Sequence, residues 1–314
     1  MNRMIKNLKE NGFVNAGRLA LSDIEVNELA NLSRYVFDSV QDVTFLGRKH
    51  PDYILDPGTE GVMRLPQLNS RIAEILDKVV SDDKVQTLLN DVLGYDYKIW
   101  QINYRRSKPG DQGLNFHQDS FGETNLCIML GDNFSGNGAT LFLAGSHLVS
   151  TRMRKWKIEA PSFLLRYLDP LLTKLKGKAG DISFFFNRTW HGRSHNSTHL
   201  TYYVILMSFF PCGATFGYEG YGKWSNEFLK DFSDTRLGML INPDIGTDKL
   251  ENGRYKVSNL TMTNVTPFAV DIEDGKIPKL QWNKYKMHLT ILLLRFIFLF
   301  RPIVRLARMF RGKP

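Results

Sequence analysis

The stretch TNLCIMLGDNFSGNGATLFLAGSH, residues 124–147, decides the fold. It holds two short apolar runs, and a segment rich in Gly, Asn and Ser lies between them. Such a pattern predicts two β-strands joined by a tight turn. The stretch therefore predicts a β-sheet made of short antiparallel strands.

Further strands are predicted on both sides of this stretch. A segment in which polar and apolar residues alternate, YDYKIWQINYRR, precedes it at residues 95–106. A loop follows this segment, and NFHQDSF comes after the loop at residues 115–121. A polar and helical insert at 150–178 comes before two more apolar strands, ISFFF at 182–186 and HLTYYVILMSFF at 199–210. Several short strands with Gly/Asn turns are typical of a double-sheet jelly roll. We therefore expect a mainly β fold with a jelly-roll core.

Helical patterns flank the predicted core. Apolar residues recur at helical spacings over 1–40, with Ser22 as a predicted N-cap, and over 67–95, where Gly94 stops the pattern. The predicted organisation is one domain at 1–275, made of N-terminal helices (1–95), a jelly-roll core (about 96–212) and a C-terminal elaboration of loops and short helices (213–275), followed by a tail at 276–314.

The composition excludes several classes of protein. Hydrophobic residues make up 43% and charged residues 23% of the 314 residues, which is ordinary for a globular protein. The two cysteines provide neither a disulfide framework nor a zinc site, and the N-terminus has no apolar signal segment, so we expect a cytoplasmic protein. The net charge of +9 comes from the tail, since every charged side chain after Asp274 is basic. The rest of the chain is close to neutral, which argues against a nucleic-acid-binding domain.

The tail combines apolar and basic residues. Residues 287–314 are strongly apolar, but Arg295 and Arg301 interrupt them, so no uncharged run reaches the ~18 residues of a spanning helix. On a helix, one sector holds Arg301, Arg305, Arg308 and Arg311. We expect basic amphipathic helices that lie peripherally in an anionic membrane surface, which would be the cytoplasmic face of the inner membrane in a bacterium. The alternative is a helix packed on the core or on a second subunit of a homo-oligomer.

His117 and Asp119 are the first candidate metal ligands. Residues at i and i+2 of an extended strand point to the same side, so the two side chains can bind one ion. A third candidate ligand, His191, follows the apolar strand at 182–186. Two imidazoles and one carboxylate form the facial triad that binds Fe(II) and leaves roughly three coordination positions open. A bidentate keto acid and dioxygen can occupy those positions.

Five short motifs follow one another along the chain. They are HQD (117–119), L-x-D-x-x-x-x-N-G (130–138), GSH (145–147), GD-x-x-x-F (180–185) and H-G-x-x-x-N (191–196). Together with ENGFV near the N-terminus, their order and wording resemble the phytanoyl-CoA dioxygenase (PhyH-like) family of Fe(II)/2-oxoglutarate-dependent oxygenases, over residues 5–212. The resemblance implies a double-stranded β-helix, which is a cupin-like jelly roll. It also implies that His117, Asp119 and His191 hold Fe(II), with 2-oxoglutarate and O2 as co-substrates.

One residue of the family pattern is missing. The pattern has an Arg shortly after the distal His that binds the far carboxylate of 2-oxoglutarate, but positions 200–202 are Leu, Thr and Tyr. The candidate replacements are His199, Arg193 and Arg105, of which only the Arg side chains offer a fixed bidentate fork. By resemblance, Gln101 and Thr140 are further candidates beside the keto acid.

These observations predict an Fe(II)/2-oxoglutarate-dependent dioxygenase that hydroxylates a C–H bond of a membrane-associated amphiphile. The basic tail suits an anionic lipid or glycolipid, and among membrane-acting relatives the chain resembles hydroxylases of the Kdo sugar of lipopolysaccharide. Two alternatives stay open. One is a soluble phytanoyl-CoA-like acyl hydroxylase whose tail is an oligomer contact, and the other is a non-catalytic metal-binding jelly-roll module tethered to the membrane.

Overall fold

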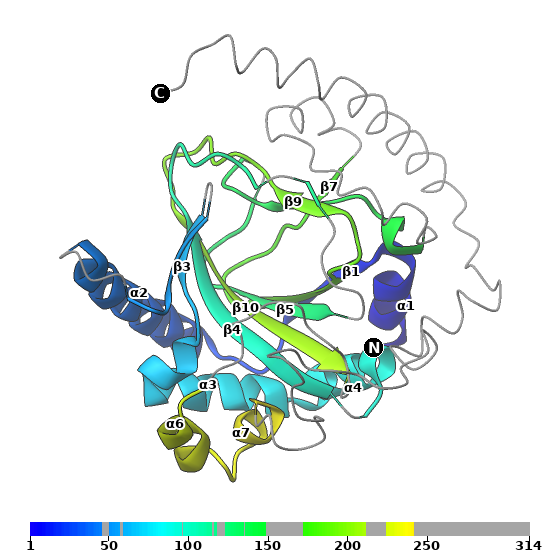
Figure 1. Ribbon diagram of the computed structural model, residues 1–314. Coiled ribbons are helices and arrows are strands. Elements are labelled where there is room, and N and C mark those ends of the chain that lie inside the picture. The colour runs from blue at the N-terminus through cyan, green and yellow to red at the C-terminus, as the bar shows by residue number, and fades with distance from the viewer. Residues whose placement is uncertain are drawn as a thin grey trace, which may run out of the picture.

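Two antiparallel β-sheets form the centre of the molecule, and helices pack against the larger one (Figure 1). The computed structural model describes residues 1–45, 50–56, 59–95, 97–114, 116–117, 123–134, 136–148, 172–211 and 224–241. Within these ranges, every pair of neighbouring strands is antiparallel. The predicted mainly β architecture with flanking helices is therefore confirmed.

The larger sheet has seven strands and the smaller sheet has three. The larger has the order β1-β8-β5-β10-β4-β3-β2 and the smaller the order β7-β6-β9. The strands of the larger sheet are β1 (Phe13–Arg18), β2 (Tyr53–Asp56), β3 (Thr59–Val62), β4 (Tyr97–Ser107), β5 (Thr124–Met129), β8 (Asp181–Phe186) and β10 (Tyr202–Pro211). Those of the smaller sheet are β6 (Thr140–Phe142), β7 (Thr173–Lys174) and β9 (His191–Arg193). Strands far apart in the sequence thus become neighbours, and β10 lies between β5 and β4.

Alternation along β10 gives the larger sheet two different faces. Ile205, Met207 and Phe209 are buried in the main core together with residues of the helices. Val204 and Leu206 pack into a second cluster between the sheets, with Cys127, Met129, Phe142, Leu175 and Phe185. Successive side chains of a strand point to opposite faces, so the strand register assigns each residue to one side or the other. We call the side of the second cluster the interior face.

Helices cover the other face of the larger sheet, and their ends carry recognisable caps. The helices that the structure describes are α1 (Asn2–Asn11), α2 (Asp23–Phe45), η1 (Leu65–Leu68), α3 (Ser70–Ser81), α4 (Asp83–Leu93), η2 (Ser146–Leu148), α6 (Asn226–Asp231) and α7 (Arg236–Ile241). The Asn69 side chain caps α3, and the Asp82 side chain caps α4. Gly94 ends α4 as predicted, and the expected short helices after residue 213 include α6 and α7.

The prediction that residues 1–40 are helical is wrong for Phe13–Arg18. Gly12 ends α1 at a φ of 81°, and the following residues form β1 along β8. The N-terminal region that was expected to hold helices also contributes β2 and β3 to the sheet. Strands this short have little periodicity of their own, so pairing with a distant strand decided their conformation.

The tail at 276–314 lies outside the described residues, so its predicted amphipathic helices stay a prediction. Most of the insert predicted at 150–178 lies outside them as well, but its described end holds strand β7 instead of a helix, because Thr173 and Lys174 pair with β6. Among the helices that the structure describes, none combines the length and apolar character that crossing a membrane requires.

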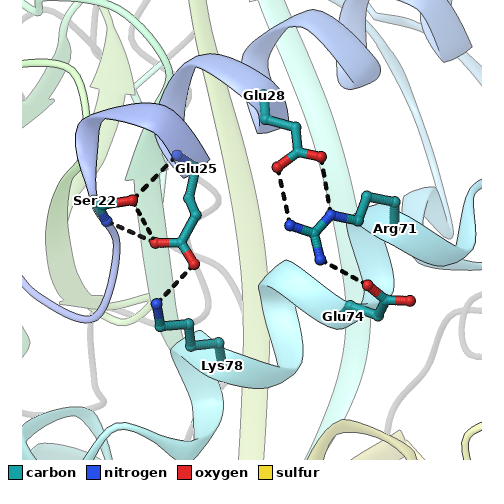
Figure 2. Close-up of polar contacts among 6 residues, drawn as sticks. All are labelled: Ser22, Glu25, Glu28, Arg71, Glu74 and Lys78. Atoms are coloured by element: carbon teal, nitrogen blue, oxygen red, sulfur yellow. Dashed lines mark hydrogen bonds and ion pairs between the residues drawn. The ribbon is translucent and has the colours of Figure 1, made fainter.

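Two groups of charged side chains connect α2 to α3 (Figure 2). At the start of α2, Glu25 accepts hydrogen bonds from the Ser22 backbone N–H at 2.8 Å and from its hydroxyl at 2.7 Å, which forms a capping box. The same carboxylate accepts from Lys78 Nζ of α3 at 2.7 Å. One turn further on, Arg71 of α3 forms two hydrogen bonds with Glu28, at 2.9 and 3.0 Å. Ion pairs between α2 and α3 therefore stabilise the helix layer in addition to its buried apolar side chains.

These contacts predict an acid-sensitive contribution to stability. The hydrogen bond from Lys78, followed by those from Ser22, lowers the pKa of Glu25 from 4.5 to about 2. A carboxyl whose pKa is lower in the folded state stabilises the fold above its unfolded pKa, and this stabilisation is lost as the pH falls from 4.5 toward about 2. We expect Glu25→Gln to flatten the pH dependence of the free energy of unfolding in that window, measured by urea denaturation. Glu227→Gln, which removes one exposed carboxylate of α6, is the control, and equal flattening in both variants would contradict the assignment.

Candidate metal centre

His117 and His191 lie side by side although they are far apart in the sequence. The backbone N–H of His117 donates to the carbonyl of His191 at 2.7 Å, and the N–H of His191 donates back to the carbonyl of His117 at 2.9 Å. The centroids of their imidazole rings are 4.5 Å apart. The residues around His117 thus add to the free edge of β9, and the two predicted histidine ligands meet.

Gly192, which follows His191 on β9, allows the backbone at Leu114 and Phe116 to lie close to β9. A Cβ atom there would lie 3.0 Å from the carbonyl oxygen of Leu114 and 3.1 Å from the Cα atom of Phe116. The Phe116 ring in turn stacks on Trp190, with centroids 5.8 Å apart. The glycine of the H-G-x-x-x-N motif is therefore explained by packing of the two strands and not by chemistry.

The ring of His191 is oriented for metal binding. Its Nδ1 atom lies 2.8 Å from the carbonyl oxygen of Thr189. A carbonyl can only accept, so Nδ1 carries the hydrogen, and in the neutral ring Nε2 keeps its lone pair for a metal. This is the arrangement that metal-binding histidines usually have. His191 is 6% exposed and contacts the rings of Phe142 and Phe185, so the interior face provides its surroundings.

The GSH corner holds the loop that carries His191. Ser146 Oγ accepts a hydrogen bond from the backbone N–H of Trp190 at 2.8 Å. Thr189 donates from its hydroxyl to the carbonyl of Gly12 at 3.0 Å. His147 Nε2 lies 2.9 Å from the carbonyl of Lys9, at the end of α1. The motif thus fixes α1 and the His191 loop to each other.

His147 has a structural role. Burial lowers its pKa to about 3, so the ring is neutral at physiological pH and donates from Nε2 to the Lys9 carbonyl. Its Nδ1 atom would be only 2.5 Å from a Cβ atom on Gly12. His147 is therefore a structural residue of the GSH corner, and the histidines at the candidate metal site are His117 and His191.

The residues present fit an iron ion. The third predicted ligand, Asp119, lies outside the described residues, and within the described ones no group of three His, Cys, Asp or Glu side chains comes together. The fit rests on two adjacent imidazoles, one of which has its tautomer set by a backbone carbonyl. With the Asp119 carboxylate two residues from His117, the donor set is that of a 2-His-1-carboxylate iron site.

A chain of hydrogen-bonded polar side chains crosses the interior face of the larger sheet. Asn103 donates to Gln101 at 2.9 Å, Gln101 donates to Ser208 at 3.1 Å, and Ser208 donates to Asn125 at 2.5 Å. Asn125 donates in turn to Asn187, which precedes the His191 loop. Burying polar groups is costly unless they are paired, and the chain satisfies most of these groups internally. The Oδ1 atom of Asn103 has no partner among the described residues and is an acceptor at one end of the chain.

The register shows which of the residues predicted to bind the co-substrate face the interior. Gln101 and Arg105 pair with Ser208 and Val204 and share their face. Thr140 pairs with Arg193 in the smaller sheet, on the same side as Phe142 and His191. His199 does not join them, since it is an exposed residue of the loop before β10, and the structure therefore does not support a role for it inside the sheets.

Sequence reasoning missed four interior residues: Asn125, Asn187, Tyr202 and Ser208. Each follows or interrupts an apolar strand with a polar side chain, and together they line the interior face. The available signal was a single polar side chain within or next to an otherwise apolar strand. It becomes specific only when the neighbouring strands are known.

The remaining motif residues hold turns. Asn137 donates to the carbonyl of Asp132 and accepts from Phe134, and Asn196 donates to the carbonyls of Ser107 and Leu200. The Asp181 carboxylate accepts from the backbone N–H of Lys178 and from the Asn15 side chain. These residues hold the turns between the strands around the site.

The histidine geometry predicts a selective loss of metal binding. His191→Ala removes a ligand whose tautomer is already set, so we expect Fe(II) affinity to fall by at least about 100-fold, measured anaerobically by calorimetry. His195→Ala, at an exposed position just after β9, is the matched control and should retain wild-type affinity. A similar loss in both variants, or in neither, would contradict the assignment.

Comparisons with known proteins agree with this geometry. Residues 36–200, just over half of the chain, match the family model for phytanoyl-CoA dioxygenase (PhyH). The ectoine dioxygenase of Bordetella parapertussis is 24% identical over 198 residues, which are 54% of this chain and 63% of the relative. The chain thus matches less than two thirds of the length of that relative.

Two solved structures with a similar fold contain a bound metal ion, and one of them also contains 2-oxoglutarate. HygX of Streptomyces hygroscopicus, solved with nickel, 2-oxoglutarate and hygromycin B, has 15% identity and a TM-score of 0.50, over 67% of this chain and 87% of HygX. EctD of S. alaskensis, solved with Fe, has 17% identity and a TM-score of 0.50, over 67% of this chain and 76% of EctD. At this identity the likeness shows the fold, which is the predicted jelly roll.

The family match and the fold agree with the motifs and with the meeting of His117 and His191. The description of the matching family model names a dioxygenase, which agrees with the predicted enzyme class. The chain belongs to the phytanoyl-CoA dioxygenase (PhyH) family.

Proposed function

We propose that this protein is an Fe(II)/2-oxoglutarate-dependent hydroxylase whose iron is held by His117, Asp119 and His191. The observation that carries the proposal is the bridge between His117 and His191, with Nδ1 of His191 bonded to the Thr189 carbonyl. The family match and the fold of proteins solved with iron or nickel and 2-oxoglutarate support it.

The proposed reaction is balanced by the co-substrates alone. A substrate C–H bond, O2 and 2-oxoglutarate become a C–OH bond, succinate and CO2. Bound iron would supply the redox chemistry and the open positions for the keto acid and dioxygen. The chain itself would orient the two imidazoles through the Thr189 carbonyl and the GSH corner, and would surround them with the apolar rings of Phe142 and Phe185. Those rings limit the access of water from the interior side.

Anaerobic titration tests this function directly. Fe(II) and 2-oxoglutarate together should give the weak visible charge-transfer band of a chelated keto acid in the wild type, and His117→Ala should abolish it. In air, the wild type should convert 2-oxoglutarate to succinate, and the variant should not. A wild-type protein with neither band nor succinate would contradict the proposal and favour a non-catalytic metal-binding module.

We further propose that the substrate is an amphiphile at a membrane surface, with a glycolipid of the lipopolysaccharide Kdo type as the named candidate. The support is the sequence of the tail, in which Arg295, Arg301, Arg305, Arg308 and Arg311 alternate with bulky apolar residues. The rest of the chain is close to neutral, so the tail would supply the attraction to anionic lipids. On this proposal the protein is peripheral to the membrane on the cytoplasmic side.

Vesicle flotation with the full-length chain checks the membrane proposal. Replacing Arg301, Arg305, Arg308 and Arg311 together by Gln should abolish binding to vesicles with anionic lipids, because each arginine near such a surface contributes about 1 kcal/mol. The matched variant with four Lys should retain binding, which falls as salt is added. Wild-type protein that stays soluble with these vesicles and sediments as an oligomer would favour the acyl hydroxylase alternative.

A further inference from the structure

Arg193 brings a positive charge onto the interior face beside the candidate metal site. It follows His191 by two residues on β9, so both side chains project to the same face. That face is the interior, because His191 contacts Phe142 and Phe185 of the interior cluster. The Nε and Nη2 atoms of Arg193 are fully buried. Part of the guanidinium is therefore buried on this face, two residues along β9 from His191.

Two hydroxyl groups accompany this guanidinium. Thr140 is the cross-strand partner of Arg193 in the smaller sheet. Tyr202 begins β10 in the facing sheet and, two residues before Val204, shares its interior side; it is 4% exposed. Burial raises the pKa of the Tyr202 phenol, and the charge of Arg193 opposes that rise, which places the two groups within electrostatic reach. Arg193, Thr140 and Tyr202 together provide a positive charge and hydroxyl donors, the combination that a carboxylate requires.

The other basic candidates are less well placed. His199 is exposed on the loop before β10. Arg105 lies on β4, and its Cδ atom lies over Gly61 of β3, where a Cβ atom would be 2.8 Å from it. The Arg105 side chain therefore leans toward β3, whereas β9 carries Arg193 directly beside His191.

The spacing along β9 matches the length of the co-substrate. Two residues of an extended strand span about 6.6 Å, which is comparable to the separation of the two carboxylates of a five-carbon diacid. A keto acid bound to iron beside His191 would face the interior side, where Val204 and Leu206 pack. Its far end would then arrive at Arg193, Thr140 and Tyr202.

We propose that Arg193, assisted by Tyr202 and Thr140, binds the distal carboxylate of 2-oxoglutarate, so that the anchoring cation comes from β9. This inference rests on the proposed function of the site. It makes Arg193 the residue that selects a dicarboxylic keto acid over a monocarboxylic one. It also explains how a chain with Tyr at position 202 can retain a keto-acid site.

The test compares two keto acids that differ only at the far end. The charge-transfer band is titrated anaerobically in the Fe(II)-loaded protein with 2-oxoglutarate and with 2-oxovalerate, which has the same five-carbon chain without the distal carboxylate. Wild type should prefer 2-oxoglutarate. In Arg193→Met the Kd for 2-oxoglutarate should rise about 100-fold, while that for 2-oxovalerate stays constant and shows that the variant is folded. Tyr202→Phe should raise only the Kd for 2-oxoglutarate, by about tenfold.

Two further variants make the test specific. The double variant Arg193→Ala/Tyr202→Arg returns a guanidinium from the opposite sheet and should restore part of the preference for 2-oxoglutarate. His199→Gln should bind both keto acids as wild type does. A preference that survives Arg193→Met, or that disappears in Arg105→Gln or His199→Gln instead, would overturn the proposal. A wild type that forms no band with either keto acid would instead contradict the proposed function, so the two failures are distinguishable.

Discussion

The reciprocal backbone hydrogen bonds between His117 and His191 are the constraint on which the rest of the site depends. They add the residues around His117 to the edge of β9, and they set both imidazoles on neighbouring strands with ring centroids 4.5 Å apart. Three neighbouring residues help to maintain that contact. Gly192 removes the side chain that would separate the strands, and Ser146 and Thr189 fix the loop that leads into β9. A metal site needs ligands held in place before the ion arrives, and here the sheet ladder provides that order.

The larger sheet separates stability from chemistry by its two faces. One face is mainly apolar and packs against the helices, and the ion pairs of Figure 2 join charged side chains of α2 and α3. The interior face instead carries the amide and hydroxyl chain from Asn103 to Asn187, besides Arg193 and the histidines. Polar groups are costly inside a protein unless they are paired, so a line of them at this place indicates a binding surface. Burial of apolar side chains on the helix-packed face offsets the cost of burying these polar groups.

The strands that carry the motifs were predictable, because each has an apolar run bounded by turn residues. The helices at 70–81 and 83–93 were predictable for the same reason, with Gly94 as their end. Strand β1 was not predictable, because a segment of only six residues is too short to distinguish a strand from the end of a helix by its pattern. The interior residues Asn125, Tyr202 and Ser208 were not predictable either, because their role depends on which strand lies opposite. The exposure of His199 on the loop before β10 was likewise not evident from its place along the chain.

The sequence by itself determined the fold class, the family and the two histidines that are proposed as metal ligands. Each of these is written in local patterns: strand periodicity, turn residues and motif spacing. Only the tertiary structure decided the tautomer of His191, the structural role of His147, and the pairing of Arg193 with Thr140 on the interior side. These depend on contacts between strands that are far apart in the chain. Register across sheets is set by the packing of both faces at once, and no local pattern of residues specifies it.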